Sequence, residues 1–201
     1  MNFKIEVAIC TFNGKDYVKQ QIESILNQTL KVNLISIYDD QSSDNTIEII
    51  EKIRQSYLGK VEIKVVKNNK NLGYIRNFIQ AISKSSHDFL FFSDQDDIWN
   101  KQKVEKIINK FLEEKVNKPT LIFSNASIVD SNGNTNGKNL WDELKFSNEN
   151  LKSELLFRNV ITGATAAINR ELVNLIKKAY ISDSVPHDYS IAILALAKGR
   201  I

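Results

Sequence analysis

The sequence is poor in cysteine, proline and glycine. Its 201 residues include one cysteine, two prolines and seven glycines. A single cysteine cannot form a disulfide framework, so we expect a reducing compartment, and the apolar run around Cys10 predicts that this residue belongs to the core. Glycine-rich and collagen-like repeats are excluded by the same composition. A chain of this length buries enough surface to fold without disulfide or metal cross-links.

Long apolar runs and a strong charge bias are also missing. No segment approaches 18 apolar residues, and the first residues lack a basic stretch followed by an apolar one, so we expect neither export nor a membrane span. The 27 basic and 24 acidic residues give a net charge of +3 and are scattered along the chain. This distribution does not favour nucleic acid as a partner. We therefore expect a cytoplasmic globular protein.

The common phosphate-binding and metal-binding loops are absent from the sequence. Neither G-x-x-x-x-G-K-[ST] nor G-x-G-x-x-G follows the first predicted strand, which leaves P-loop and dinucleotide-binding proteins without their signatures. An EF-hand loop would need an oxygen ligand and a glycine where the chain has Ile98 and Trp99. A receiver-type phosphoacceptor module would need acids after the first strand, where Thr11 and Asn13 stand.

Short apolar runs alternate with helical patterns over the first 130 residues. The runs predict strands at 5–10, 34–38, 61–66, 89–92 and 121–129. Between them, apolar residues recur at helical spacing with short connections. This alternation predicts an α/β fold in which helices cover a central sheet.

The pattern changes beyond residue 130. A polar, loop-rich stretch comes first, and it is followed by predicted elements. These are a strand at 162–169 and helices at 170–179 and 188–198. No repeat or proline- or glycine-rich linker separates the two parts, so we predict a single domain over 1–201, with halves at 1–130 and 131–201.

Carboxylates cluster where two of the predicted strands end. Asp39 and Asp40 follow one strand, and Asp94, Asp96 and Asp97 follow another. Ligands of open α/β sheets bind beyond the carboxyl ends of the strands. Acids placed so closely repel one another unless a cation or hydrogen-bond donors lie nearby, and Mg2+ or Mn2+ held together with substrate phosphates would meet that need. The alternative is that these aspartates only cap the helices that follow.

Other polar residues have both a functional and a structural interpretation. The Asp40 carboxylate could accept a hydrogen bond from the imide N–H of uracil or thymine, although its segment is also an ordinary turn sequence. Asp188 stands where a polar loop meets an apolar helix, so it is either a catalytic carboxylate or a helix N-cap. His187 beside it is a weaker candidate, and His87 is predicted on the surface.

Taken together, these motifs resemble the family 2 glycosyltransferases of the GT-A fold, and most closely the bacterial rhamnosyltransferase-like branch that builds surface polysaccharides. The matching stretches, in family order, are 7–14, 38–46, 71–73 with Asn77, 92–99, 162–169 and 187–188. The resemblance implies a mainly parallel central sheet with helices on both faces. It also implies a Rossmann-like nucleotide-binding half followed by an acceptor-side half.

The resemblance implies a role for each matched residue. The nucleotide-binding residues would be Thr11, Asn13, Asp40, Asn77 and Asp94. The metal, Mg2+ or Mn2+, would lie on Asp96 with Asp97, in a motif that looks like the family's DxD. The wall beside the donor sugar and acceptor would be formed by Gly163, Ala164, Thr165 and His187. Asp188 matches the catalytic base that deprotonates the acceptor hydroxyl, which implies inversion at the anomeric carbon.

The partners implied are a nucleotide-diphospho-sugar and a glycan or lipid-linked acceptor. The donor would be a UDP- or dTDP-sugar, with dTDP-rhamnose among the candidates, and lipid-linked acceptors imply peripheral association with the inner face of the cell membrane. Family members generally continue beyond this point, and Gly199 as a helix C-cap followed by a strand start at 200–201 also predicts a C-terminally shortened chain. The alternative is therefore a nucleotide-sugar-binding fragment without full transferase activity. A sugar-phosphate nucleotidyltransferase would instead need a glycine- and arginine-rich loop after the first strand.

Overall fold

A six-stranded sheet forms the centre of the computed structural model, which describes residues 3–59, 61–113, 117–130 and 133–201. Its strands, in spatial order, are β3 (Glu62–Lys67), β2 (Leu34–Asp39), β1 (Ile5–Thr11), β4 (Phe89–Ser93), β8 (Ala166–Asn169) and β5 (Leu121–Phe123). The first four are parallel, and β8 runs antiparallel to both of its neighbours. The predicted α/β class with a mainly parallel sheet is confirmed.

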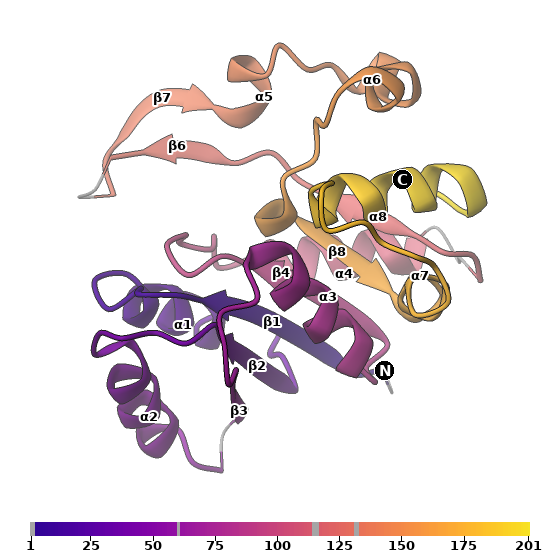
Figure 1. Cartoon of the computed structure of the whole chain (residues 1–201). Helices are drawn as coiled ribbons and strands as arrows, with labels where there is room; N and C mark the ends of the chain where they lie inside the picture. Colours follow the sequence, from indigo (N-terminus) through magenta and orange to yellow (C-terminus); the bar gives the residue numbers. More distant parts are fainter. Residues whose placement is uncertain (1–2, 60, 114–116, 131–132) are drawn as a thin grey trace.

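Helices cover both faces of this sheet (Figure 1). One face packs against α1 (Val18–Leu26), α2 (Thr46–Ser56) and α4 (Lys103–Glu113). The other packs against α3 (Tyr74–Lys84), α6 (Leu151–Phe157), α7 (Arg170–Ile176) and α8 (His187–Lys198). Two apolar cores, one on each face, therefore enclose the sheet.

The alternation of side chains along β1 shows how one strand serves both cores. Val7 and Ile9 belong to the core under α1, whereas Ala8 between them belongs to the core under α3. On α1, the spacing of Ile22 and Ile25 keeps both side chains fully buried on one side of the helix. Each buried isoleucine contributes about 1.5–3 kcal/mol, so apolar runs of this kind are strong determinants of the fold.

The prediction of one continuous strand over 121–129 is wrong, because the chain leaves the main sheet after Phe123. A second sheet of two strands pairs β6 (Ser127–Val129) with β7 (Thr135–Asn139), and Figure 1 shows it as an arm beside the main body. Asn125 lies at the break, and its Oδ1 accepts hydrogen bonds from the N–H of Ala126 and of Trp141, at 2.9 and 3.1 Å. An asparagine side chain that binds backbone groups in this way competes with the strand ladder.

Short turns complete the second half of the chain. They are α5 (Leu140–Glu143) and the 3-10 turns η1 (Asn148–Asn150) and η2 (Gly163–Thr165). The predicted strand at 162–169 is therefore shorter than expected, since its first part forms η2. Trp141 after β7 packs against Phe123 and Phe146, with ring centroids 5.8 and 5.2 Å away, and so anchors the arm to the body.

The last residues run beside β5, as the predicted strand start implies. Arg200 bridges Thr120 in parallel, and the backbone bonds to Pro119 O and from Leu121 N are 2.9 and 3.0 Å long. Gly199 occupies the C-cap position of α8. A Cβ there would lie 1.7 Å from Pro119 O, so the close approach of the two backbones requires glycine.

The amino ends of the strands hold a buried polar cluster that the sequence did not predict. Glu6 on β1 is 2% exposed and accepts hydrogen bonds from Ser36 Oγ at 2.6 Å and Ser85 Oγ at 2.7 Å. The expected surface position of His87 is wrong, because its Nδ1 lies 3.0 Å from Glu6 Oε2 and its side chain is 16% exposed. Among the described residues, no helix combines the length and apolar character needed to cross a membrane.

Candidate functional site

A cleft of about 480 Å³ opens at the carboxyl ends of β1, β2 and β4. It is lined by Cys10, Thr11, Phe12, Asp40, Asn71, Gly73, Tyr74, Asn77, Phe78, Asp94, Gln95 and Asp96. Four of the five predicted nucleotide-binding residues thus lie in one cleft with the first of the two predicted metal ligands. Cys10 is half-buried and lines the cleft instead of lying fully in the core, and burial raises the pKa of its thiol.

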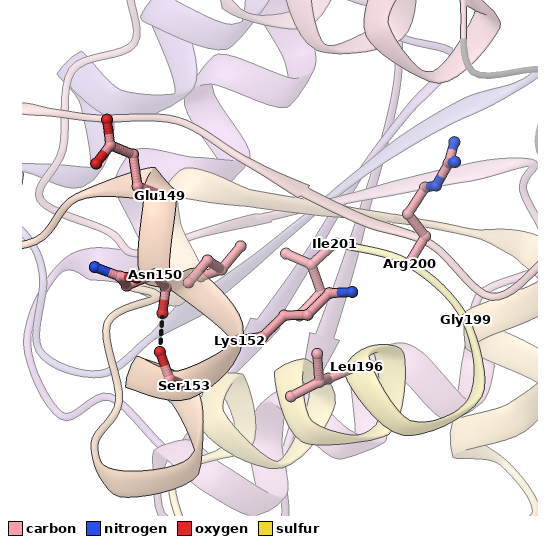
Figure 2. A pocket seen from close by; sticks show the side chains of 9 residues that line it. Glu149, Asn150, Lys152, Ser153, Leu196, Gly199, Arg200 and Ile201 are labelled. Atoms are coloured by element: carbon pink, nitrogen blue, oxygen red, sulfur yellow. Dashed lines mark hydrogen bonds between the residues drawn. The ribbon is translucent and has the colours of Figure 1, made fainter.

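A larger cavity, of about 600 Å³, lies between α6 and the end of α8 (Figure 2). Its walls include Lys152, Leu196 and Ile201. None of the clustered carboxylates or predicted site residues lines it. Size alone therefore does not mark the site, and the cleft at the strand ends remains the candidate because the chemistry gathers there.

Asp40 shapes the loop that closes one side of the cleft. This side chain is 3% exposed, and its Oδ1 accepts hydrogen bonds from Asn68 Nδ2 at 2.9 Å and Leu72 N at 2.7 Å. Its Oδ2 accepts one from Gly73 N at 2.8 Å. A carboxylate offers about four acceptor sites, so Oδ2 retains one for a ligand.

Thr11 and Asn77 are both held by β2, whereas Asn13 does not line the cleft. The Thr11 hydroxyl donates to Asp39 Oδ1 at 2.9 Å, and Asn77 Nδ2 donates to Tyr38 O at 2.8 Å. Asn13 does not line the cleft, since its Oδ1 accepts a hydrogen bond from Ser43 N at 2.9 Å. A nucleotide contact by Asn13 stays a prediction. In the structure, the Asn13 side chain contacts the loop after β2.

Two of the acids after β4, Asp94 and Asp96, line the cleft. Asp94 is partly buried, and this burial raises the pKa of its carboxyl to about 7. The negative charges of Asp97, Asp96 and Asp188 add to the rise. Asp188 comes from the far end of the sequence, so the structure brings the predicted base close enough for its charge to act on Asp94.

These acids suit a divalent cation that takes only one or two of its ligands from the protein. The described part of the chain contains no group of three or more His, Cys, Asp or Glu side chains arranged to hold a metal ion. It therefore offers no all-protein cage, but Mg2+ and Mn2+ commonly take one or two carboxylates and complete their shell with substrate oxygens and water. Asp96 is exposed at the cleft, whereas Asp97 is not among the cleft-lining residues. The geometry therefore favours Asp96 over Asp97 as the ligand.

Lys103, which the sequence did not single out, links the two halves beneath these acids. Its Nζ donates to Ala164 O in η2 at 2.5 Å and lies 4.0 Å above the ring of Trp99, which is buried. Burial lowers the pKa of Lys103 to about 8, against the attraction of Asp97 and Asp94. The Lys103 ammonium group therefore has two partners, the Ala164 carbonyl and the face of the Trp99 ring.

Two glutamines fix the DxD segment from opposite sides. Gln95 pairs with the backbone of Phe12, since its Oε1 accepts from Phe12 N at 2.9 Å and its Nε2 donates to Phe12 O at 3.1 Å. Gln21 on α1 is fully buried, and its amide contacts Ser93 Oγ at 2.5 Å and Trp99 Nε1 at 3.1 Å. The side chains on either side of Asp94 are therefore tied to α1 and to the residue after β1.

The Asp188 carboxylate contacts the segment before β8, and it is not the N-cap of α8. The N-cap of α8 is Pro186, and no side-chain cap bond is formed there. Instead, the Asp188 carboxylate accepts hydrogen bonds from Asn159 Nδ2 at 3.0 Å and from Gly163 N at 3.1 Å. These bonds hold the carboxylate in one orientation. Asn159 contacts the candidate base, although no sequence motif indicated this residue.

His187 forms part of the packed wall behind the cleft. It is 5% exposed and stacks on Phe78, with ring centroids 4.2 Å apart and planes at 14°. Burial lowers the pKa of His187 to about 4. A Cβ on Gly163 would lie 2.9 Å from His187 Nε2, so the predicted small residue at this position is needed for packing.

Sequence comparison places the chain in a known family. The model of Glycosyl transferase family 2 matches residues 6–176, and the chain belongs to that family. It is 31% identical over 182 residues to the dTDP-rhamnosyl transferase RfbG of Shigella flexneri, and this match covers 87% of the chain and 58% of RfbG. It is also 36% identical over 114 residues to the beta-1,3-glucosyltransferase WfaP of Escherichia coli, covering 56% of this chain and 43% of that protein.

Solved structures share the fold. TarS 1-349 of S. aureus, in complex with UDP, superposes with a TM-score of 0.70 at 20% identity, over 96% of this chain and 55% of that one. The mannosyltransferase PcManGT of Pyrobaculum calidifontis, in complex with GDP-Man and Mn2+, gives 0.69 at 14% identity, over 100% and 55%. The predicted GT-A architecture is thereby confirmed. The chain spans a little over half the length of these proteins and of RfbG.

Proposed function

We propose that this chain binds a nucleotide-diphospho-sugar and transfers its sugar, with inversion, to a hydroxyl of a glycan or lipid-linked acceptor. One observation carries the proposal. Asp188 directly follows His187, whose ring stacks on Phe78 in the wall of the cleft, and its charge contributes to the raised pKa of Asp94, so a candidate base lies beside the candidate diphosphate site. Membership of the family supports the reaction class.

The nucleotide would lie along the cleft between the loops after β1 and β2. Thr11, Asp40 and Asn77 are the polar groups on this side, and Phe12 and Tyr74 are large exposed rings. Aromatic faces stack on bases, and the remaining acceptor site on Asp40 suits the imide N–H of uracil or thymine. We infer a UDP- or dTDP-sugar as donor. The similarity to RfbG makes dTDP-rhamnose a candidate.

The diphosphate would approach the acids after β4. Asp96, with Asp94 or Asp97, would hold Mg2+ or Mn2+, which when bound offsets the negative charge that develops on the departing nucleoside diphosphate. Gln95 fixes the segment that carries these acids through its pair of bonds to Phe12. Without a cation, the acids would repel the diphosphate, so we expect donor binding to depend on the metal.

Asp188 would act as the general base. The acceptor O–H gives its proton to the carboxylate while the acceptor oxygen forms a bond to the anomeric carbon. The bond from that carbon to the diphosphate oxygen breaks on the opposite face, and the nucleoside diphosphate leaves with the bonding pair. Gly163, Ala164 and Thr165, with His187, would form the wall beside the sugar. Lipid-linked acceptors would place the protein at the inner face of the cell membrane.

Asp188→Asn tests the base. The variant keeps the shape of the side chain but cannot take the proton, so we expect kcat to fall by about 10²–10⁴-fold while UDP affinity is retained. The measurement is release of nucleotide diphosphate from UDP-glucose and dTDP-rhamnose with Mn2+, paired with calorimetric binding of UDP. The matched control is Asp183→Asn, which changes an exposed carboxylate in the loop before α8 that pairs with Arg76. Equal activity of wild type and Asp188→Asn would refute the assignment.

Asp96→Ala tests the metal site. Because the variant removes the exposed acid of the cleft, UDP with Mn2+ should no longer raise the melting temperature, whereas it should still stabilise the control Asp16→Ala, which lies outside the cleft. An undiminished Mn2+-dependent shift in Asp96→Ala would show that the metal lies elsewhere. If the wild type binds UDP-sugars but releases no nucleotide, the alternative holds and the chain binds nucleotide-sugars without full transferase activity. Pyrophosphate exchange would instead indicate a nucleotidyltransferase.

A further inference from the structure

The two oxygens of the Asp188 carboxylate have unequal surroundings. Oδ1 accepts hydrogen bonds from Asn159 Nδ2 at 3.0 Å and from Tyr189 N at 2.7 Å. Oδ2 accepts one, from Gly163 N at 3.1 Å. Since each carboxylate oxygen offers about two acceptor sites, Oδ1 is saturated and Oδ2 keeps one site. The protein therefore distinguishes between the two oxygens before any substrate arrives.

Asn159 is itself held in one orientation. Its Oδ1 accepts a hydrogen bond from Ile161 N at 3.1 Å, so the amide oxygen is used and the amide nitrogen faces Asp188. The next residues, Val160 and Ile161, are each 1% exposed and anchor the segment in the core. The donor directed at Asp188 is thus fixed by packing and by its own backbone.

We propose that Asn159 is the positioning residue of the base: it saturates Oδ1 of Asp188 and leaves Oδ2 as the oxygen that takes the acceptor proton. This inference rests on the proposed function, in which Asp188 is that base. A neutral amide suits the role, because it orients the carboxylate without adding a positive charge that would weaken it as a base. In the transfer step, the proton moves from the acceptor oxygen to Oδ2.

Asn159→Asp is the sharpest test, because aspartate has the same shape and keeps the acceptor for Ile161 N but replaces the donor to Asp188 with an anion. Asn159→Ala removes the side chain without adding charge and serves where the aspartate variant folds poorly. Asn139→Asp is the matched control, since Asn139 also donates to a carboxylate, that of Asp142, and accepts from Asp142 N at 3.0 Å, outside the cleft.

The assay is nucleotide diphosphate release by the full chain from UDP-glucose and dTDP-rhamnose with Mn2+, separated into kcat and KM. We expect kcat to fall about tenfold in Asn159→Ala and about 100-fold in Asn159→Asp, within the contribution of a general base. KM, UDP affinity and melting temperature should match those of Asn139→Asp. The double variant Asn159→Asp/Asp188→Asn should be no slower than Asp188→Asn alone, because the two residues act as one unit.

The outcomes separate this inference from the function on which it rests. If Asn159→Asp is as active as Asn139→Asp, the positioning role is overturned. It is also overturned if the loss appears in KM, or adds to that of Asp188→Asn, because either result indicates a general structural effect. If Asp188→Asn itself matches the wild type, or the wild type releases no nucleotide from either donor, the proposed function fails and takes this inference with it.

Discussion

The stability of this fold should depend on pH through His187, a buried imidazole at the start of α8. The ring is 5% exposed, stacks on Phe78 and has no hydrogen-bond partner for either nitrogen among the described residues. A protonated ring would carry a positive charge into this environment without an acceptor to compensate it. Burial therefore lowers the pKa of His187 from 6.5 to about 4, although the nearby negative charge of Asp188 opposes the shift.

The sign and size of the effect follow from these two values. Above pH 6.5 the imidazole is neutral in both the folded and the unfolded chain, and its full contribution to stability is present. Between pH 6.5 and 4 only the unfolded chain binds the proton, so the free energy of unfolding falls by about 1.4 kcal/mol per pH unit. The total loss is about 3 kcal/mol, and it is complete once the folded state also takes the proton.

The assay is urea unfolding of wild type and His187→Leu from pH 4 to pH 8. Leucine fills much of the same space and cannot titrate, so the stability of the wild type relative to the variant should fall by about 3 kcal/mol from pH 7 to pH 4. The chain has two histidines, and His87→Gln is the control that accounts for the other one. Parallel stability curves for wild type and His187→Leu, or a His187 resonance that titrates at or above pH 6.5, would refute the reasoning.

Two further predictions concern Gly199 and Gln95. Gly199→Ala would place a Cβ 1.7 Å from Pro119 O and should lower the free energy of unfolding by about 1–3 kcal/mol in thermal or urea unfolding. The control Lys198→Ala should change it little, and equal melting temperatures for the two variants would contradict the prediction. Gln95→Leu removes both bonds to Phe12 and should weaken UDP binding about tenfold in calorimetry, with exposed Gln102→Leu as control. Unchanged affinity would show that the Gln95 bonds do not shape the nucleotide site.

The fold was predictable where local pattern and tertiary environment agree. The apolar run in β2 is buried along its whole length, as a strand covered on both faces must be, and the helical spacing in α1 gives one buried side. The prediction failed around Asn125, because a polar side chain that binds the backbone of the next residue and of Trp141, 16 residues away, leaves no periodic signal. The predicted start of β8 at residue 162 was wrong for a similar reason, since residues 163–165 form a turn in which Gly163 contacts His187 and Asp188 of α8.

The candidate site was predictable only in part, for a related reason. Clustered acids such as Asp94 and Asp96 are visible in the sequence because they stand together after an apolar strand. Lys103 and Asn159 are not visible, since their roles depend on contacts with residues 61 and 29 positions away. A lysine in a lysine-rich helix and an asparagine in a polar loop carry no local signal. Each becomes a candidate only when its partner is known.

All residues that line the cleft belong to the first half of the chain, and contacts between the halves bring Asp188 and η2 next to it. Asp94 experiences the charges of Asp96, Asp97 and Asp188, and Lys103 opposes them. The Lys103 ammonium, however, is engaged by Ala164 O and the Trp99 ring, so its contact ties η2 to α4 while much of the negative charge stays available to a cation brought with the donor. The same turn, η2, supplies the Gly163 N–H that holds Asp188. A shift of η2 would therefore disturb the acids of the donor side and the base of the acceptor side at once, which is how two distant stretches of sequence form one site.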